Sequence, residues 1–209
     1  MKHTLLFITI IFWSITIAPT FAQDRCNSIL NKVVTEYDKS NGISAKFVIN
    51  SITNGYETSI SGNILLKGKM FAFTTDVMEC GYDGETLWSY IKSNEEINLS
   101  NPDEEEIINM NPYLLFKNYN KRFNCSYEGK KGTSETLLLT PKNSNDNIKS
   151  VKASVNSTML FPSRIEIINK DKSQIIITIS DYNSQINIKG DEFVFDARKY
   201  KDIEIIDLR

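Results

Sequence analysis

Apolar side chains recur first at helical spacing and then at strand spacing along this chain. Between Asp24 and Lys39 they lie three or four positions apart, which predicts a helix with one apolar stripe. That stripe consists of Cys26, Ile29, Leu30, Val33, Val34 and Tyr37. From Ile43 the period changes to two, with Phe47 and Ile49 alternating with Lys46 and Asn50, as in a half-buried strand.

Short turn signals then separate a series of alternating segments. Asn54-Gly55 and Asp83-Gly84 are typical of tight hairpin turns, and Gly68-Lys69 marks another turn between them. Consecutive hairpins predict an antiparallel meander rather than a parallel sheet. The further predicted strands span residues 59–67, 70–76, 86–92, 123–128, 135–140, 149–155, 163–169 and 173–180, with two shorter pieces around Ile186 and Ile188 and around Phe193 and Phe195.

A helical interruption divides this meander. Asn101-Pro102 ends the first series of strands, and the acidic run at 103–106 is typical of a solvated helix start. Asn111 and Pro112 form a second start, since Asn is a good N-cap and Pro suits the first helical position. The short helix that follows carries more apolar area than its length requires, and its apolar side chains are Tyr113, Leu114, Leu115, Phe116 and Tyr119.

The first 22 residues have the pattern of a cleavable signal peptide. A basic start precedes an apolar run from Leu5 to Ile17, which is too short to cross a bilayer, and Thr20-Phe21-Ala22 supplies small residues at the cleavage site. Cys26 follows Gln23-Asp24-Arg25, which is not a lipobox, so we expect no lipid on this cysteine. The sequence thus predicts a signal peptide at 1–22 and a single exported domain at 23–209.

Composition excludes several classes of function. The 209 residues carry 24 Lys and Arg against 26 Asp and Glu, so the net charge of -2 gives no reason to expect nucleic-acid binding. The single histidine, His3, lies in the predicted signal peptide, which leaves the exported domain without histidine-based catalysis or metal ligation. No GxSxG motif and no phosphate-binding glycine loop occurs. We therefore expect no enzyme, no metal site and no cofactor.

Three cysteines remain after the predicted cleavage: Cys26, Cys80 and Cys125. An oxidising compartment permits one disulfide with one thiol left over, and their spacing matches no zinc pattern. Three free buried thiols are the alternative, and the sequence leaves both open.

Several stretches in order resemble the family of LolA-like outer-membrane lipoprotein carrier proteins. The segments at 43–47 and 61–68 are similar to the first strand of that family and to its G-x-L-x-x-K strand. The segment Tyr82-Asp83-Gly84-Glu85-Thr86-Leu87-Trp88-Ser89-Tyr90 is similar to the family's D-G-K-T-L-W-x-Y hairpin. Asn111-Pro112 with its short helix, the segment 139–142 and the closing segment 193–196 also fit, so the resemblance covers nearly the whole exported domain.

The resemblance implies an α+β fold, in which a curved antiparallel sheet forms a half-open β-barrel and a lid of short helices covers an apolar cavity. It implies a monomeric periplasmic carrier of lipoprotein acyl chains that receives acylated lipoproteins from an inner-membrane lipoprotein-releasing ABC transporter and delivers them to an outer-membrane acceptor. The alternative is a lipoprotein-sensing regulatory module, or another lipid-binding periplasmic module, of the same fold. The residues that we expect to line the cavity and lid are Phe47, Ile64, Leu66, Phe71, Phe73, Trp88, Tyr90, Met110, Leu114, Leu115, Phe116 and Tyr119.

One position departs from the family pattern. Well-known members have an arginine after the lysine that ends the second strand, and this arginine helps to hold the lid closed. Gly68 occupies that position here, and Lys69 follows it as the candidate substitute.

Overall fold

A computed structural model describes residues 18–201 and 203–209, so most of the predicted signal peptide lies outside the described residues. The helices are α1 (Ala18–Lys39), α2 (Glu104–Met110), α3 (Pro112–Lys117), α4 (Tyr119–Arg122) and the 3-10 helix η1 (Ala197–Lys199). The strands of the first series are β1 (Ile43–Thr53), β2 (Tyr56–Lys67), β3 (Met70–Thr75), β4 (Met78–Tyr82), β5 (Leu87–Ile91) and β6 (Glu96–Ser100). The remaining strands are β7 (Phe123–Lys131), β8 (Ser134–Pro141), β9 (Ile148–Asn156), β10 (Phe161–Asn169), β11 (Gln174–Asn183) and β12 (Glu204–Asp207).

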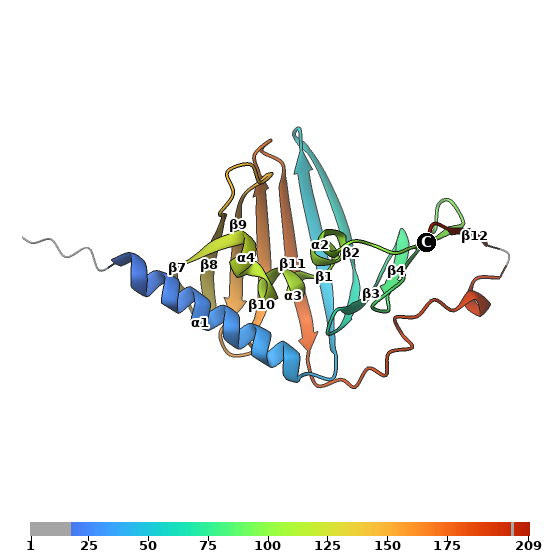
Figure 1. The fold of residues 1–209 in the computed structure, drawn as a ribbon, viewed down its shortest axis with the longest axis horizontal. Coiled ribbons are helices and arrows are strands. Elements are labelled where there is room, and N and C mark those ends of the chain that lie inside the picture. Colours follow the sequence, from blue (N-terminus) through green and yellow to red (C-terminus); the bar gives the residue numbers. More distant parts are fainter. Residues whose placement is uncertain (1–17, 202) are drawn as a thin grey trace, which may run out of the picture.

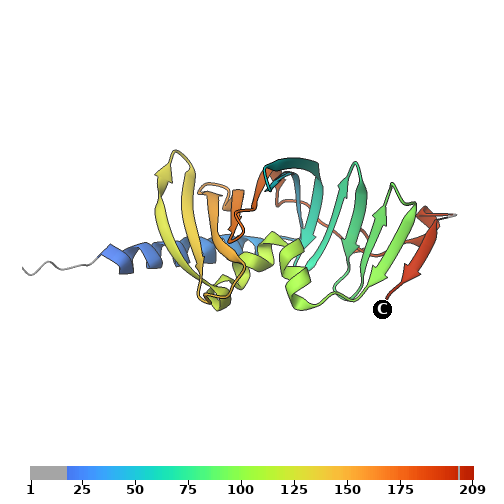
Figure 2. The ribbon, with the colours of Figure 1, turned by 90° about the horizontal axis from the view of Figure 1, so that it is seen from above.

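All twelve strands form one sheet in the order β12-β6-β5-β4-β3-β2-β1-β11-β10-β9-β8-β7. Neighbours in the sheet are antiparallel except β12, which pairs with β6 in parallel. The sheet is open, because its edge strands β7 and β12 lie at opposite ends of the molecule (Figures 1 and 2). Helices α1 to α4 lie against one face of this sheet, which we call the inner face (Figure 1). The predicted α+β fold, a half-open barrel with a lid of short helices, is confirmed.

The apolar stripe of α1 is packed on strands β7 to β10. Leu30 is fully buried there against side chains such as Leu139 and Val151, and we call this continuous core the solid half of the inner face. A disulfide joins Cys26 on α1 to Cys125 on β7, whereas Cys80 is a free, buried cysteine. Of the two arrangements that the sequence left open, the structure has the one with a single bridge.

The C-terminal segment crosses the outer face of strands β4 to β6. Trp88 is buried there with Ile97 and Leu99, and its indole nitrogen donates a hydrogen bond of 2.8 Å to the carbonyl of Phe193. Gly81 makes this packing possible, because a Cβ atom at that position would lie 2.4 Å from the Trp88 nitrogen. The outer face of this part of the sheet is therefore covered by protein.

Some predicted boundaries were wrong. Helix α1 begins at Ala18 rather than Asp24, and β4, β6 and β12 were not predicted as strands. The predicted strand pieces around Ile188 and Phe193 are irregular, because this segment docks by buried side chains and pairs with no strand. No helix within the described residues combines the length and the hydropathy needed to cross a membrane.

Candidate functional site

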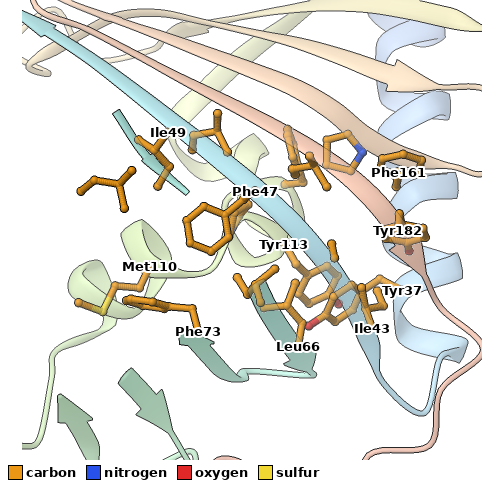
Figure 3. A pocket seen from close by; sticks show the side chains of 18 of the residues that line it. Tyr37, Ile43, Phe47, Ile49, Leu66, Phe73, Met110, Tyr113, Phe161 and Tyr182 are labelled. Carbon is orange, nitrogen blue, oxygen red and sulfur yellow. The ribbon is translucent and has the colours of Figure 1, made fainter. Parts of the chain in front are cut away.

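An apolar cavity of about 330 Å³ lies between the inner face of the sheet and the helices (Figure 3). The sheet contributes its floor, and α1, α2 and α3 contribute its roof. We call this part of the inner face the hollow half. Its floor includes Phe47, Ile49, Ile60, Ile64, Leu66, Phe73, Ile177 and Ile179, and its roof includes Val33, Tyr37, Met110, Pro112, Tyr113 and Phe116.

Strand register explains why the floor is apolar. Phe47 of β1 lies opposite Ile179 of β11, and Ile64 of β2 lies opposite Phe73 of β3. Directly paired residues of antiparallel strands point to the same side, so these alternating side chains all face the helices. Gly62, the partner of Phe47 on β2, leaves room for its ring, since a Cβ atom there would lie 2.9 Å from the ring's Cζ.

The hydroxyl groups in the cavity wall are bonded to protein. Tyr37 donates to the carbonyl of Gly68 at 2.9 Å, and Tyr113 donates to the carboxylate of Asp38. Thr75 donates to the carbonyl of Met78 at 3.1 Å. Burial raises the pKa of Tyr37 well above its ordinary value, so this phenol stays neutral over the physiological range. The wall therefore presents hydrocarbon surface to the cavity.

Helix α3 is fixed to α1 by three side-chain contacts. The rings of Tyr113 and Tyr37 are stacked with their centroids 3.4 Å apart. Asp38 accepts the Tyr113 hydroxyl and also pairs with Lys117 at 3.2 Å. These contacts lower the pKa of Asp38, although the partial burial of its carboxylate acts in the opposite direction.

Gly68 contributes a backbone carbonyl to the roof instead of a side chain. The buried Asn111, between α2 and α3, donates to this carbonyl at 3.4 Å, and its Oδ1 accepts the Tyr113 amide at 3.1 Å. The Lys69 ammonium, the candidate substitute for the family's arginine, donates to the carbonyl of Gly84 and lies 5.9 Å from the ring of Tyr82. Its hydrogen bond therefore goes to the β4–β5 turn and to no residue of α2 or α3 that the structure describes.

Half of the expected site residues line the cavity. These are Phe47, Ile64, Leu66, Phe73, Met110 and Phe116. Phe71 and Leu114 pack in the adjoining cluster, where the rings of Phe71 and Phe73 are stacked 6.4 Å apart, but they do not reach the cavity surface. Their contribution is to support the wall.

Two expected residues, Trp88 and Tyr90, lie on the wrong face of the sheet. The register from Phe73 through Cys80 to Ser89 places Ser89 on the inner face, so the neighbouring Trp88 and Tyr90 point outward. They pack instead against the C-terminal segment. The sequence of β5 shows clear alternation, but large apolar side chains occur on both of its faces. Neither the alternation nor the family resemblance indicates which face points to the cavity.

Leu115 and Tyr119 also lie away from the cavity. Both pack against the solid half, and the hydroxyl of Tyr119 donates to Asn27 of α1 at 2.6 Å. Helix α3 therefore has two apolar sides, with Phe116 reaching both the cavity and the solid half. Leu115→Asp is therefore expected to destabilise the fold rather than to act on ligand binding in the cavity.

Several lining residues were missed by sequence reasoning. Tyr37 and Val33 belonged to the predicted helix stripe, and Tyr113 to the short helix, but neither pattern indicated a cavity. Phe161 and Tyr182 come from strand ends, and their rings are stacked 4.3 Å apart. The described residues contain no cluster of three or more metal-ligating side chains.

The sequence model of the outer membrane lipoprotein carrier protein LolA matches residues 18–172. The chain belongs to this family. No curated protein matches the chain with significance.

Several solved structures are similar to this chain. An uncharacterized conserved protein from Thermus thermophilus has a TM-score of 0.59 at 9% identity, covering 88% of this chain and 99% of that one. A LolA superfamily protein from Nitrosomonas europaea has a TM-score of 0.46 at 13% identity and covers 82% and 98%. The lipoprotein LppX from Mycobacterium tuberculosis has a TM-score of 0.46 at 10% identity and covers 79% and 99%.

Proposed function

We propose that this protein carries acylated lipoproteins across the periplasm by holding their acyl chains in the apolar cavity. The observation that carries this proposal is the wall itself: its lining residues, as far as the structure describes them, include no charged side chain, and the hydroxyls of Tyr37, Tyr113 and Thr75 already have protein partners. Membership of the lipoprotein carrier family supports it.

The free energy of burying hydrocarbon is sufficient for such a carrier. Each methylene group transferred from water contributes about 0.8 kcal/mol, so even one acyl chain offers a large gross affinity. Ordering the chain and displacing the roof subtract from this gain. A roof that packs on the floor in the empty state lowers the net affinity, which allows an acceptor to remove the cargo.

The proposal includes the route. The predicted signal peptide at 1–22 would export the chain to the periplasm, where the Cys26–Cys125 disulfide could form. An inner-membrane lipoprotein-releasing ABC transporter would supply the cargo, and an outer-membrane acceptor would receive it. The carrier would act as a monomer, without a cofactor and without covalent chemistry.

The test is release of lipoproteins from membranes. Purified protein is added to spheroplasts that retain a radiolabelled lipoprotein, and the supernatant is analysed by gel filtration and native mass spectrometry. A carrier should appear in a soluble complex with the acylated lipoprotein, while the same lipoprotein lacking its acyl chains should not form this complex. Acyl binding without any release, together with capture of a membrane-bound signalling protein, would favour the regulatory module instead.

A further inference from the structure

The two ends of the cavity differ in exposure. At one end Ile60, Val77 and Met110 are 41%, 50% and 37% exposed although they line the cavity. Ile60 is the register partner of Ile49, and Figure 3 shows Ile49 and Met110 on the side of the cavity away from Phe161 and Tyr182. We call these three side chains the rim. Apolar side chains that are both exposed and continuous with a cavity indicate its mouth.

The opposite end is closed by aromatic side chains. Tyr37 and Phe161 are 6% and 8% exposed, and Phe161 is stacked on Tyr182 (Figure 3). The Tyr37 hydroxyl is bonded to the carbonyl of Gly68, so this phenol is already partnered. We call this part the blind end. Its described lining residues offer a hydrocarbon surface and include no Lys or Arg that could receive a carboxylate or phosphate.

An ionised head group is therefore disfavoured inside the cavity. Burying an unpaired charge costs several kcal/mol, and the described lining side chains supply no counter-charge that would offset this cost. Only the hydrocarbon part of an amphiphile fits the blind end, and its polar end has to remain in water at the rim.

The rim is also bordered by the less firmly attached part of the roof. Helix α3 is bound to α1 through Tyr113 and Lys117. In the described part of α2, the side-chain hydrogen bonds stay within its own N-cap, between Asp103 and Glu106. Met110 is the last residue of α2, and its unbranched side chain can change rotamer to admit a chain while the buried Asn111 and α3 keep their places.

From these observations we infer that a ligand enters with its terminal methyl group first, between the rim side chains, and rests with its head group at Ile60, Val77 and Met110. The blind end at Phe161 and Tyr182 then receives the methyl end of the chain. This inference rests on the proposed function and adds to it the orientation of the cargo, so the peptide part of a lipoprotein would leave the carrier beside the β1–β2 hairpin and α2.

The test uses two photoreactive stearic acids and the unmodified protein. One carries a diazirine next to the carboxyl group, and the other carries it next to the terminal methyl group. After irradiation, tandem mass spectrometry locates the labelled residues. The carboxyl-proximal probe should label peptides that contain Ile60, Val77 or Met110, and the methyl-proximal probe should label peptides that contain Phe161 or Tyr182.

The outcomes separate this inference from the proposed function. A reversed labelling pattern, or the same pattern with both probes, would overturn the orientation while leaving acyl binding intact. Failure of both probes to bind, measured by native mass spectrometry before irradiation, would overturn the proposed function and the inference together. Labelling confined to the outer face around Trp88 would also overturn both.

Discussion

The solid half and the hollow half are built from the same sheet face but are covered in different ways. In the solid half, α1 places Leu30 directly on β7 to β10, and the Cys26–Cys125 disulfide fixes it there. In the hollow half, α1 contributes mainly its last two turns, and short helices span the remaining width. The comparison indicates that the cavity arises where short helices replace the long helix α1 above the sheet. The sheet itself continues through both halves.

The largest effect should follow from removing the disulfide. A bridge that spans a sequence separation of 99 is expected to contribute about 4 kcal/mol to the free energy of unfolding, mainly by restricting the unfolded chain. The double variant Cys26→Ser with Cys125→Ser should lose about this amount in urea-induced unfolding. Reductant should lower the stability of the parent protein and leave the double variant unchanged. Equal sensitivity of both proteins would contradict the prediction.

Truncation of one core residue in each half should sharpen the comparison. Leu139 is fully buried in the solid half, so Leu139→Ala should cost about 2–5 kcal/mol through lost contacts and a new cavity. Ile179 already faces open space in the hollow half, so Ile179→Ala should cost no more than about 1 kcal/mol. Thermal and urea unfolding of both variants measure this. Similar losses would show that the hollow half is packed like the solid half.

A charged residue at the rim should weaken acyl-chain binding without a comparable loss of fold stability. Ile60→Asp places a carboxylate at the mouth, and we expect acyl-chain affinity to fall about tenfold, or about 1.4 kcal/mol, while the fold is kept. Val48→Asp is the matched control, because Val48 is 37% exposed and points to the outer face. Isothermal calorimetry with a short-chain lysolipid provides the affinities. Equal loss in both variants would place the mouth elsewhere.

The smallest expected effect is a loss of unfolding free energy at acidic pH, caused by the Arg122–Asp146 pair at the edge of the solid half. The hydrogen bond from Arg122 lowers the pKa of Asp146, against the effect of partial burial. The resulting stabilisation is complete above the unfolded pKa near 4 and is lost as the pH falls through the lower folded pKa, and it should amount to no more than about 1 kcal/mol. Unfolding of Asp146→Asn between pH 2 and 6 should show a flatter pH dependence than the parent. An unchanged profile would assign the acid sensitivity to other carboxylates.

The floor of the cavity could be predicted from the sequence, but most of the roof could not. Alternation along β1, β2 and β3 correctly grouped Phe47, Ile64 and Phe73, because the side-chain period of a strand is fixed by its backbone. Alternation alone does not say which group faces the helices. Where the outer face is also covered, as at Trp88, both groups are apolar and the choice depends on tertiary structure.

The roof depends on contacts between distant segments. Tyr37 reaches Tyr113 and Gly68, which are 76 and 31 positions away, and neither helix shows this partnership in its own pattern. The C-terminal segment illustrates the same limit, since Ile188 and Phe193 have strand-like spacing but are buried on irregular backbone. The sequence pattern around Ile188 and Phe193 shows that these residues are apolar, but their neighbours can be read only from the folded structure.

The close packing of Trp88 on Gly81 has a consequence for the fluorescence of the protein. The indole ring is enclosed by the C-terminal segment and bonded to Phe193, on the face of the sheet opposite the cavity. Its emission should therefore be insensitive to cargo and should shift to longer wavelengths only when the C-terminal segment detaches. Trp88 is thus a natural fluorophore for following the undocking of this segment, in the same sample and at the same time as lipid loading on the other side.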